Sequence, residues 1–353
     1  MDEDCHGNQR GISVGFVLSK SCAFVSNHRN SRKPWHILIM QTSSKYYILI
    51  PAYNRRDVTL QCLRQLQSLI ATHDWRVCII DDGSTDGTSE AIRQNFPEVV
   101  LLHGNGNLYW TGAMELGMRY AVACGAECCV WMNDDLQTDT NSIYAIVALA
   151  MSRHAVVAAE GVVQDANRPP YFYPGFYRRI NRLESRSLDI DASEPISVDC
   201  CRGNLAAIPC SVIDKIGYPN GTDIPHYAGD AEYTLRATEA VTPCLILMQA
   251  VFFEQETVRN DNRSWLLDKR PVSKIWAATL SRRGMLYPPM LRGYYIGHWG
   301  FFGLMTIISI LLRLIAISIL RMIIPRKILH FLYARHSHSY KAYQGRPETT
   351  GTN

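Results

Sequence analysis

Three short segments in the first half of the chain concentrate residues that could bind a cation and phosphate groups. They are Pro51–Arg55, Asp81–Thr88 and Asn133–Asp135. Carboxylates that lie close together repel one another and lose hydration when buried, so a fold that gathers them usually binds a cation or a donor-rich ligand. Hard divalent cations take oxygen ligands, often one or two carboxylates plus substrate phosphates. The three segments therefore predict a site for a metal ion and a diphosphate.

Each segment also has a purely structural explanation. Asp82-Gly83-Ser84 is a common turn sequence, and Asp86 is a suitable cap for a helix that follows. A binding site becomes the better explanation because all three segments occupy equivalent places, each directly after a predicted strand.

The elements that must position these segments are an alternating series of strands and helices after residue 45. The pattern predicts strands at 46–50, 77–80, 99–102, 128–132 and 155–159, and helices at 57–69, 85–95, 111–123 and 141–151. This order predicts an α/β fold whose mainly parallel central sheet is flanked by helices on both faces. Ligands of such sheets bind beyond the carboxyl ends of the strands, where the three segments fall.

A glycine-bearing loop, Gly104–Gly112, enters one of the predicted helices. Its backbone amides could meet phosphates or a sugar, while Tyr109 and Trp110 offer flat apolar faces. Neither a P-loop lysine pattern nor a GxGxxG sequence follows the first strand, which argues against an NTPase or a dehydrogenase.

Four motifs in this order resemble those of the inverting glycosyltransferases of family 2. They read ILIPAYN at 48–54, IIDDGSTDGT at 79–88, GNLYWTG at 106–112 and WMNDD at 131–135. The resemblance covers roughly residues 45–260. It implies the nucleotide-diphospho-sugar transferase (GT-A) fold, a nucleotide-sugar donor, a divalent metal (Mg²⁺ or Mn²⁺) and inversion at the anomeric carbon. The Tyr-Trp-Thr-Gly loop is similar to that of bacterial rhamnosyl- and galactofuranosyltransferases.

The resemblance also assigns residues to the donor site. Asn133-Asp134-Asp135 takes the place of the family's DxD motif, with Asp135 as the metal ligand and Asn133 in place of the first acid, so one negative charge is lost. The residues that the resemblance places against the nucleotide sugar are Pro51, Tyr53, Asn54, Asp81, Asp82, Trp110, Gly112, Asn133 and Asp134.

The second half of the chain would supply the general base. An inverting transfer needs a carboxylate to take the proton of the acceptor hydroxyl. His226–Arg236 resembles the family's Glu-Asp segment, in which Asp230 falls on the base and Gly229 replaces the usual Glu. Two alternatives stay open: Glu232 is the base, or Asp230 only caps the helix.

Further expectations concern the residues that contact the acceptor and the groups that coordinate the metal. Arg202 and Asn204 are the candidate acceptor contacts, although Arg202 could equally be an ordinary surface charge. Many relatives place a His near the metal, and Phe252–Glu256 contains none. Either another group completes the metal shell or the dependence on metal is loose.

An apolar segment, Trp299–Ile324, is interrupted by Arg313 and Arg321. It is long enough to span a bilayer, yet a basic tail after Pro325 and a donor site that belongs in the cytosol conflict with a single span. We expect a helix lying in the membrane interface, with the tail on anionic headgroups. A spanning helix, and a helix packed in a core or a homodimer, stay open.

Composition narrows the class of protein. The 353 residues are 47% hydrophobic and carry a net charge of +4, so most of the chain should fold and no nucleic-acid partner is expected. The 11 cysteines form no paired CxxC pattern, which favours a reduced compartment over a zinc site. The acidic start is unlike a secretory signal, and Met40 could be the true start.

These observations predict an inverting hexosyl- or deoxyhexosyltransferase at the cytosolic face of the cell membrane, acting on a lipid-linked or polysaccharide acceptor in cell-envelope biosynthesis. A nucleotidyltransferase and an inactive, membrane-associated sugar-binding protein are the alternatives. The expected divisions are an N-terminal extension (1–44), the GT-A domain (45–265), a connecting segment (266–298), the apolar helix (299–324) and the basic tail (325–353).

Overall fold

The structure is a computed structural model. It describes residues 44–165, 168–172, 175–188, 193–254, 268, 270–325 and 328–329. Nearly all of the N-terminal extension, the suggested start at Met40 and most of the basic tail lie outside these residues.

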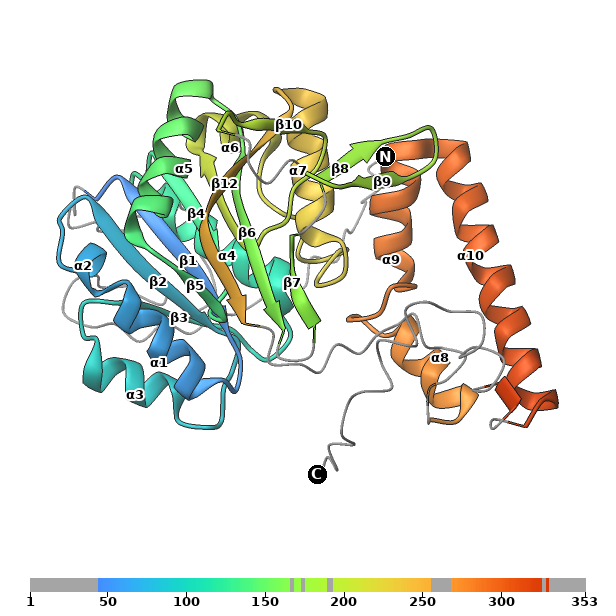
Figure 1. The fold of residues 1–353 in the computed structure, drawn as a ribbon. Helices are drawn as coiled ribbons and strands as arrows, with labels where there is room; N and C mark the ends of the chain where they lie inside the picture. The colour runs from blue at the N-terminus through green and yellow to red at the C-terminus, as the bar shows by residue number, and fades with distance from the viewer. Residues whose placement is uncertain are drawn as a thin grey trace, which may run out of the picture.

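A 10-stranded sheet forms the centre of the described part of the chain (Figure 1), in the order β10-β12-β6-β11-β4-β1-β2-β3, with β5 paired to β12 and β7 paired to β6. Its first half is parallel and consists of β1 (Tyr46–Ala52), β2 (Trp75–Asp81), β3 (Val100–His103) and β4 (Cys128–Met132). The apolar runs of β1, β2 and β4 are buried on both faces, as strands covered by helices on both sides must be, whereas the edge strand β3 is only partly buried.

The second half of the sheet mixes directions. Its strands are β5 (Leu136–Thr138), β6 (Val157–Asp165), β7 (Arg168–Phe172), β10 (Ile196–Val198), β11 (Leu205–Pro209) and β12 (Cys244–Glu254). β11 runs antiparallel between β4 and β6, whereas β6 and β12 are parallel to each other. β8 (Gly175–Arg178) and β9 (Leu183–Arg186) form a separate hairpin.

Helices cover both faces of the sheet, so the molecule has two main cores. One face carries α1 (Arg56–Gln65), α2 (Gln67–Ile70), α3 (Thr88–Asn95) and α5 (Thr140–Arg153). The other carries α4 (Tyr109–Ala123), α6 (Cys210–Ile216) and α7 (Gly229–Ala240). The α/β fold class expected from the strand and helix pattern, with a mostly parallel central sheet, is thus confirmed.

The predicted elements of the first half are present, with local differences at turns. The helix expected at 57–69 is interrupted at Leu66, which separates α1 from α2. The helix expected at 85–95 begins at Thr88, because Gly87 takes a left-handed conformation and Asp86 accepts a hydrogen bond from the Thr88 amide (3.1 Å). The strand expected at 155–159 continues to Asp165.

A helical hairpin follows the sheet domain. α8 (Val272–Leu280) leads to α9 (Pro288–Met290) and the π-helical η2 (Leu291–Ile296), and α10 (Gly297–Ile323) then runs back beside α9 (Figure 1). Gly300 has a positive φ of 53°, which turns the chain. A Cβ at Gly303 would lie 2.0 Å from the Tyr295 carbonyl oxygen, so glycine permits the close approach of the two arms.

The hairpin is tied to the sheet domain next to α7. The Trp299 indole Nε1 donates to the Arg179 carbonyl (2.8 Å), and His298 pairs with Glu239 of α7 (3.0 Å). On the opposite side of α10, the Trp276 Nε1 of α8 donates to the Ser318 hydroxyl (2.9 Å). His298, Trp299 and Ser318 of α10 thus contact protein, whereas Ser309 and Arg313 are exposed.

Most of the remaining surface of α10 is apolar. Across the described residues, one helix, Pro288–Ile323, is long and apolar enough to cross a membrane, with a mean hydropathy of 2.4 in its most apolar 18 residues. Large exposed side chains on it are Phe301, Phe302, Leu304, Met305, Ile308, Leu312, Ile315, Ile319, Leu320, Met322 and Ile323.

Candidate active site

Two buried aspartates anchor the loops at the carboxyl end of β2. Asp82 Oδ1 accepts from the Gly106 amide (2.9 Å) and Oδ2 from the Tyr109 amide (2.9 Å), which fixes the glycine-bearing loop. Asp81 accepts from the Ser84 amide (2.8 Å) and from the Ser89 hydroxyl. Asp81 and Asp82 were expected to contact the nucleoside. In the structure their carboxylate oxygens accept hydrogen bonds from protein groups.

The loop after β1 presents its residues to solvent. Pro51 lies within β1, paired with Ile80, whereas Tyr53 is exposed and Asn54 takes a left-handed conformation with a φ of 51°. Asn54 Oδ1 accepts from the Thr85 amide (2.8 Å), so the loop after β1 is fixed to the loop after β2. Tyr53 is thereby placed at the edge of the site.

Arg55 is a residue of the site that the sequence reasoning missed. Its guanidinium lies 2.7 Å from Asp134 Oδ1 and 3.2 Å from Asp135 Oδ2. Asp134 also accepts from the Thr59 hydroxyl (2.9 Å) and is buried, which raises its pKa to about 6 although Arg55 opposes the shift. Arg55 therefore joins the loop after β1 to the DxD-like segment after β4.

Asp135 is the carboxylate of this segment that remains open to solvent. Its side chain is 45% exposed and opens on a cavity of about 670 Å³, which is lined by Asn54, Arg55, Arg56, Asp57, Val58, Asp86 and Asp135. No group of three or more His, Cys, Asp or Glu side chains suited to a metal occurs among the described residues. A cation at this site would therefore take Asp135 as its protein ligand and complete its coordination with phosphate oxygens and water.

Asn133, in the segment after β4, connects the loop before α4 to the segment before β11. Its Oδ1 accepts from the Trp110 indole Nε1 (2.9 Å), and its Nδ2 donates to Asn204 Oδ1 (3.0 Å). An ionised aspartate could accept from Trp110 but could not donate to that oxygen. The departure from the family's first Asp thus has a structural role.

Gly112 has a packing role in the first turn of α4. A Cβ on Gly221 would lie 2.5 Å from the Gly112 Cα, so the two backbones are in close contact. This contact holds the loop before α7 against α4.

Asp230 opens helix α7 beside the glycine-bearing loop. Its Oδ2 accepts from the Gly203 amide (3.1 Å), and a Cβ on Gly203 would meet both Trp110 (2.5 Å) and Asp230 (3.1 Å). A Cβ at Gly229 would lie 1.8 Å from the Thr111 hydroxyl. The family's usual Glu at position 229 would therefore collide with α4 in this chain.

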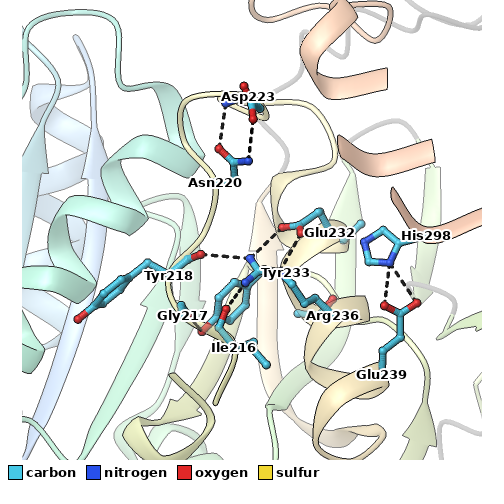
Figure 2. Close-up of polar contacts among 12 residues, drawn as sticks. Ile216, Gly217, Tyr218, Asn220, Asp223, Glu232, Tyr233, Arg236, Glu239 and His298 are labelled. Carbon is cyan, nitrogen blue, oxygen red and sulfur yellow. Dashed lines mark hydrogen bonds and ion pairs between the residues drawn. The ribbon is translucent and has the colours of Figure 1, made fainter. Parts of the chain in front are cut away.

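Glu232 is positioned differently, as Figure 2 shows. Its carboxylate binds Arg236 through two contacts of 2.9 and 3.1 Å, and the same guanidinium donates to the carbonyls of Tyr218 (3.1 Å) and Ile216. Glu232 is 8% exposed. Its carboxylate is engaged in fixing the segment before α7 to the helix.

A buried carboxyl group that the sequence reasoning missed lies near Asp230. Glu160 of β6 is 2% exposed, and its Oε2 has no hydrogen-bond partner among the described residues. Burial raises the pKa of Glu160 to about 7, Arg202 lowers it, and Asp230 raises it further. The Arg202 guanidinium carbon also lies 5.1 Å from the centroid of the Phe176 ring, and the residue is half-buried.

Part of the chain is similar to a known protein family. Residues 47–217 match the family model described as glycosyl transferase family 2. The match includes the loops after β1, β2 and β4 and the Arg202–Asn204 segment, and ends before Asp230. It supports a nucleotide-sugar glycosyltransferase. No curated protein matches the chain.

Solved structures resemble part of the chain. They include GalNAc-T7 with UDP, GalNAc and Mn²⁺ (13% identity, TM-score 0.47, 60% of this chain and 44% of that chain) and S. aureus TarS (13%, 0.44, 59% and 36%). A third is S. aureus TarS 1–349 (15%, 0.43, 59% and 60%). This chain thus covers less than two thirds of each of these proteins.

Proposed function

We propose that the protein is an inverting glycosyltransferase that moves a hexosyl or deoxyhexosyl group from a nucleotide-diphospho-sugar to a hydroxyl of a lipid-linked or polysaccharide acceptor. The Tyr-Trp-Thr-Gly loop favours a rhamnosyl or galactofuranosyl donor. The observation that carries the proposal is the position of Asp230: its carboxylate accepts a hydrogen bond from the Gly203 amide, Gly203 lies against Trp110, and Trp110 donates to Asn133 in the segment after β4.

Asp230 is the base in this reaction, and Glu232 is not, because Arg236 holds the Glu232 carboxylate on both oxygens. The Gly203 amide orients the Asp230 carboxylate. As the acceptor oxygen bonds to the anomeric carbon, its proton passes to Asp230, and the bond from that carbon to the diphosphate breaks with its electron pair on the leaving oxygen. Inversion follows from attack opposite the leaving group.

The leaving diphosphate would be received on the donor side. Arg55 and Arg56 line the cavity there together with Asp57, Asp86 and Asp135, so the lining has no net positive charge of its own. A bound Mg²⁺ or Mn²⁺ on Asp135 would neutralise part of the charge that develops on the leaving group. Arg55 pairs with both Asp134 and Asp135, so its own charge is already offset and the cation would be the main source of this compensation.

The membrane part of the proposal depends on α10. Several of its polar side chains, Ser318 among them, contact protein while its large apolar side chains are exposed, as in a helix that lies on a membrane. With the donor site in the cytosol, the cytosolic face of the cell membrane is the location proposed, and cell-envelope biosynthesis the setting.

The test begins with thermal-shift screening of nucleotide sugars on the full chain. The stabilising donor is then incubated with Mn²⁺ and the phosphate product is identified. Release of a nucleoside diphosphate supports glycosyl transfer or donor hydrolysis. A parallel reaction with a nucleoside triphosphate and a sugar 1-phosphate tests the alternative enzyme: release of pyrophosphate there, with formation of a nucleotide sugar, would indicate a nucleotidyltransferase. The absence of both reactions would support an inactive sugar-binding protein.

A further inference from the structure

Tyr109 stands at the centre of the candidate active site in an unusual conformation. Its φ is +53°, a value that costs energy for a bulky side chain and is often retained at functional sites. Its amide binds Asp82, and its ring lies 6.3 Å from the His226 ring, four residues before Asp230. The loop geometry thus directs the Tyr109 ring toward α7.

Two arginines from the helical hairpin cover this ring. Arg282 and Arg283 follow α8, and their guanidinium carbons lie 5.9 and 5.8 Å from the Tyr109 ring centroid. Both side chains are exposed, and neither has a carboxylate partner within the described ranges of the chain. Adjacent arginines repel each other, so two of them held over one ring without acids indicate a site for an anion.

The arginine pair lies between the active site and apolar surface. Arg283 and burial both lower the pKa of His226, so the imidazole is neutral near pH 7 and can hydrogen-bond without adding a third charge. Leu280, two residues before Arg282, is exposed, and the same hairpin carries the exposed apolar face of α10. A ligand with a charged head and an apolar tail would match both surfaces.

We propose that Arg282 and Arg283 bind the phosphate groups of a lipid-linked acceptor, whose apolar chain lies along the helical hairpin. The inference rests on the proposed function and names the acceptor class for that site. Phosphate could also come from the donor, but the cavity at Asp135, where we place the donor diphosphate, is not lined by Arg282 or Arg283. The acceptor is therefore the source that we assign.

The test compares two double variants of the full-length protein in detergent. Arg282→Gln/Arg283→Gln removes the site, and Arg292→Gln/Arg313→Gln removes two other exposed arginines of the hairpin as a matched control. The probes are farnesyl diphosphate, farnesol of the same chain length, and UDP, GDP and dTDP, with affinity measured by calorimetry. None of these measurements requires turnover.

The expected result is that farnesyl diphosphate binds about 10-fold or more weakly to the first variant than to the control variant, because charge-assisted hydrogen bonds to phosphate are lost. Farnesol and nucleoside diphosphate affinities should be equal in the two variants. The proposal is overturned if the wild type does not bind farnesyl diphosphate or if the two variants bind it equally. A fall in nucleoside diphosphate affinity alone would assign the arginines to the donor. Failure of donor turnover would contradict the proposed function, while this comparison would still report on the arginine pair.

Discussion

The Trp110 indole donates a hydrogen bond to the amide oxygen of Asn133, and the distance between Nε1 and Oδ1 is 2.9 Å. Since Asn133 also donates to Asn204, one side chain holds the loop before α4 and the segment before β11. A residue that stands in a metal-binding motif by sequence therefore serves to connect two sides of the site.

Asn133→Ala should destabilise the protein by about 1–3 kcal/mol, because it leaves polar groups of Trp110 and Asn204 without their partners. Urea denaturation measures this change. Trp110→Phe removes the indole donor, so in a double-mutant cycle the two effects should be less than additive. Strict additivity would mean that the hydrogen bond contributes nothing to stability.

Asp135→Asn should remove the dependence of nucleoside diphosphate binding on Mn²⁺. The amide lacks the charge that would hold the cation. Calorimetry with and without Mn²⁺ gives the dependence. Asp57→Asn is the control, because Asp57 lines the same cavity but pairs with Arg56. Equal Mn²⁺ dependence in both variants would remove Asp135 from the metal site.

Glu160→Gln should change how stability depends on pH. The folded protein raises the pKa of Glu160 from 4.5 to about 7, so the folded state binds the proton more tightly than the unfolded state. The stability that this group contributes is fully present below pH 4.5 and is lost as the pH rises through about 7, by roughly 3 kcal/mol at most. The groups that face it are Arg202, which opposes the shift, and Asp230, which adds to it.

Denaturation midpoints at pH 5 and pH 8 test this effect. The wild type should lose more stability over this interval than Glu160→Gln, whose amide does not titrate. Glu127→Gln is the control, since the Glu127 side chain is 47% exposed. Identical losses in all three proteins would show that Glu160 is ionised at both pH values.

Substitution of Leu312, Ile319 and Met322 by Gln should reduce sedimentation of the full chain with vesicles while leaving nucleotide binding unchanged. The three side chains are exposed on α10 and pack on none of the described cores, so the fold should persist. High salt should weaken binding of the wild type only in part, because apolar contact is not screened. Unchanged sedimentation of the triple variant would contradict the membrane proposal.

The sequence predicted the parallel half of the fold well because local patterns decide it. The apolar run of β4 is buried on both faces, and its boundaries at Cys128 and Met132 were predicted without error. Short edge strands such as β10 were not predicted, since three residues have no periodicity to read.

Side-chain partners were less predictable than positions. Asp82 was expected at the sheet edge, but nothing in the sequence indicated that it would bind the amides of Gly106 and Tyr109. Arg55 and Glu160 were missed because their partners lie far along the chain, and Arg55 is separated from Asp134 by 79 positions. A basic residue directly beside a predicted donor loop was the available signal for Arg55, whereas Glu160 looked like an ordinary strand residue.

The final prediction concerns the base. Asp230→Asn keeps the shape of the side chain and can still accept from the Gly203 amide, but it cannot take the proton of the acceptor hydroxyl. Transfer should fall by roughly 10²- to 10⁴-fold, with little change in donor affinity. The alternative that Asp230 only caps α7 is wrong as stated, because Ala228 is the N-cap and Asp230 is the second residue of the helix. If Asp230 instead only binds the Ala231 and Gly203 amides, transfer should persist, because Asn can accept the same hydrogen bonds. Glu232→Gln is the companion variant: it weakens the pairing with Arg236 and should lower stability more than catalysis. Near-wild-type transfer by Asp230→Asn, with loss of transfer in folded Glu232→Gln, would move the base to Glu232.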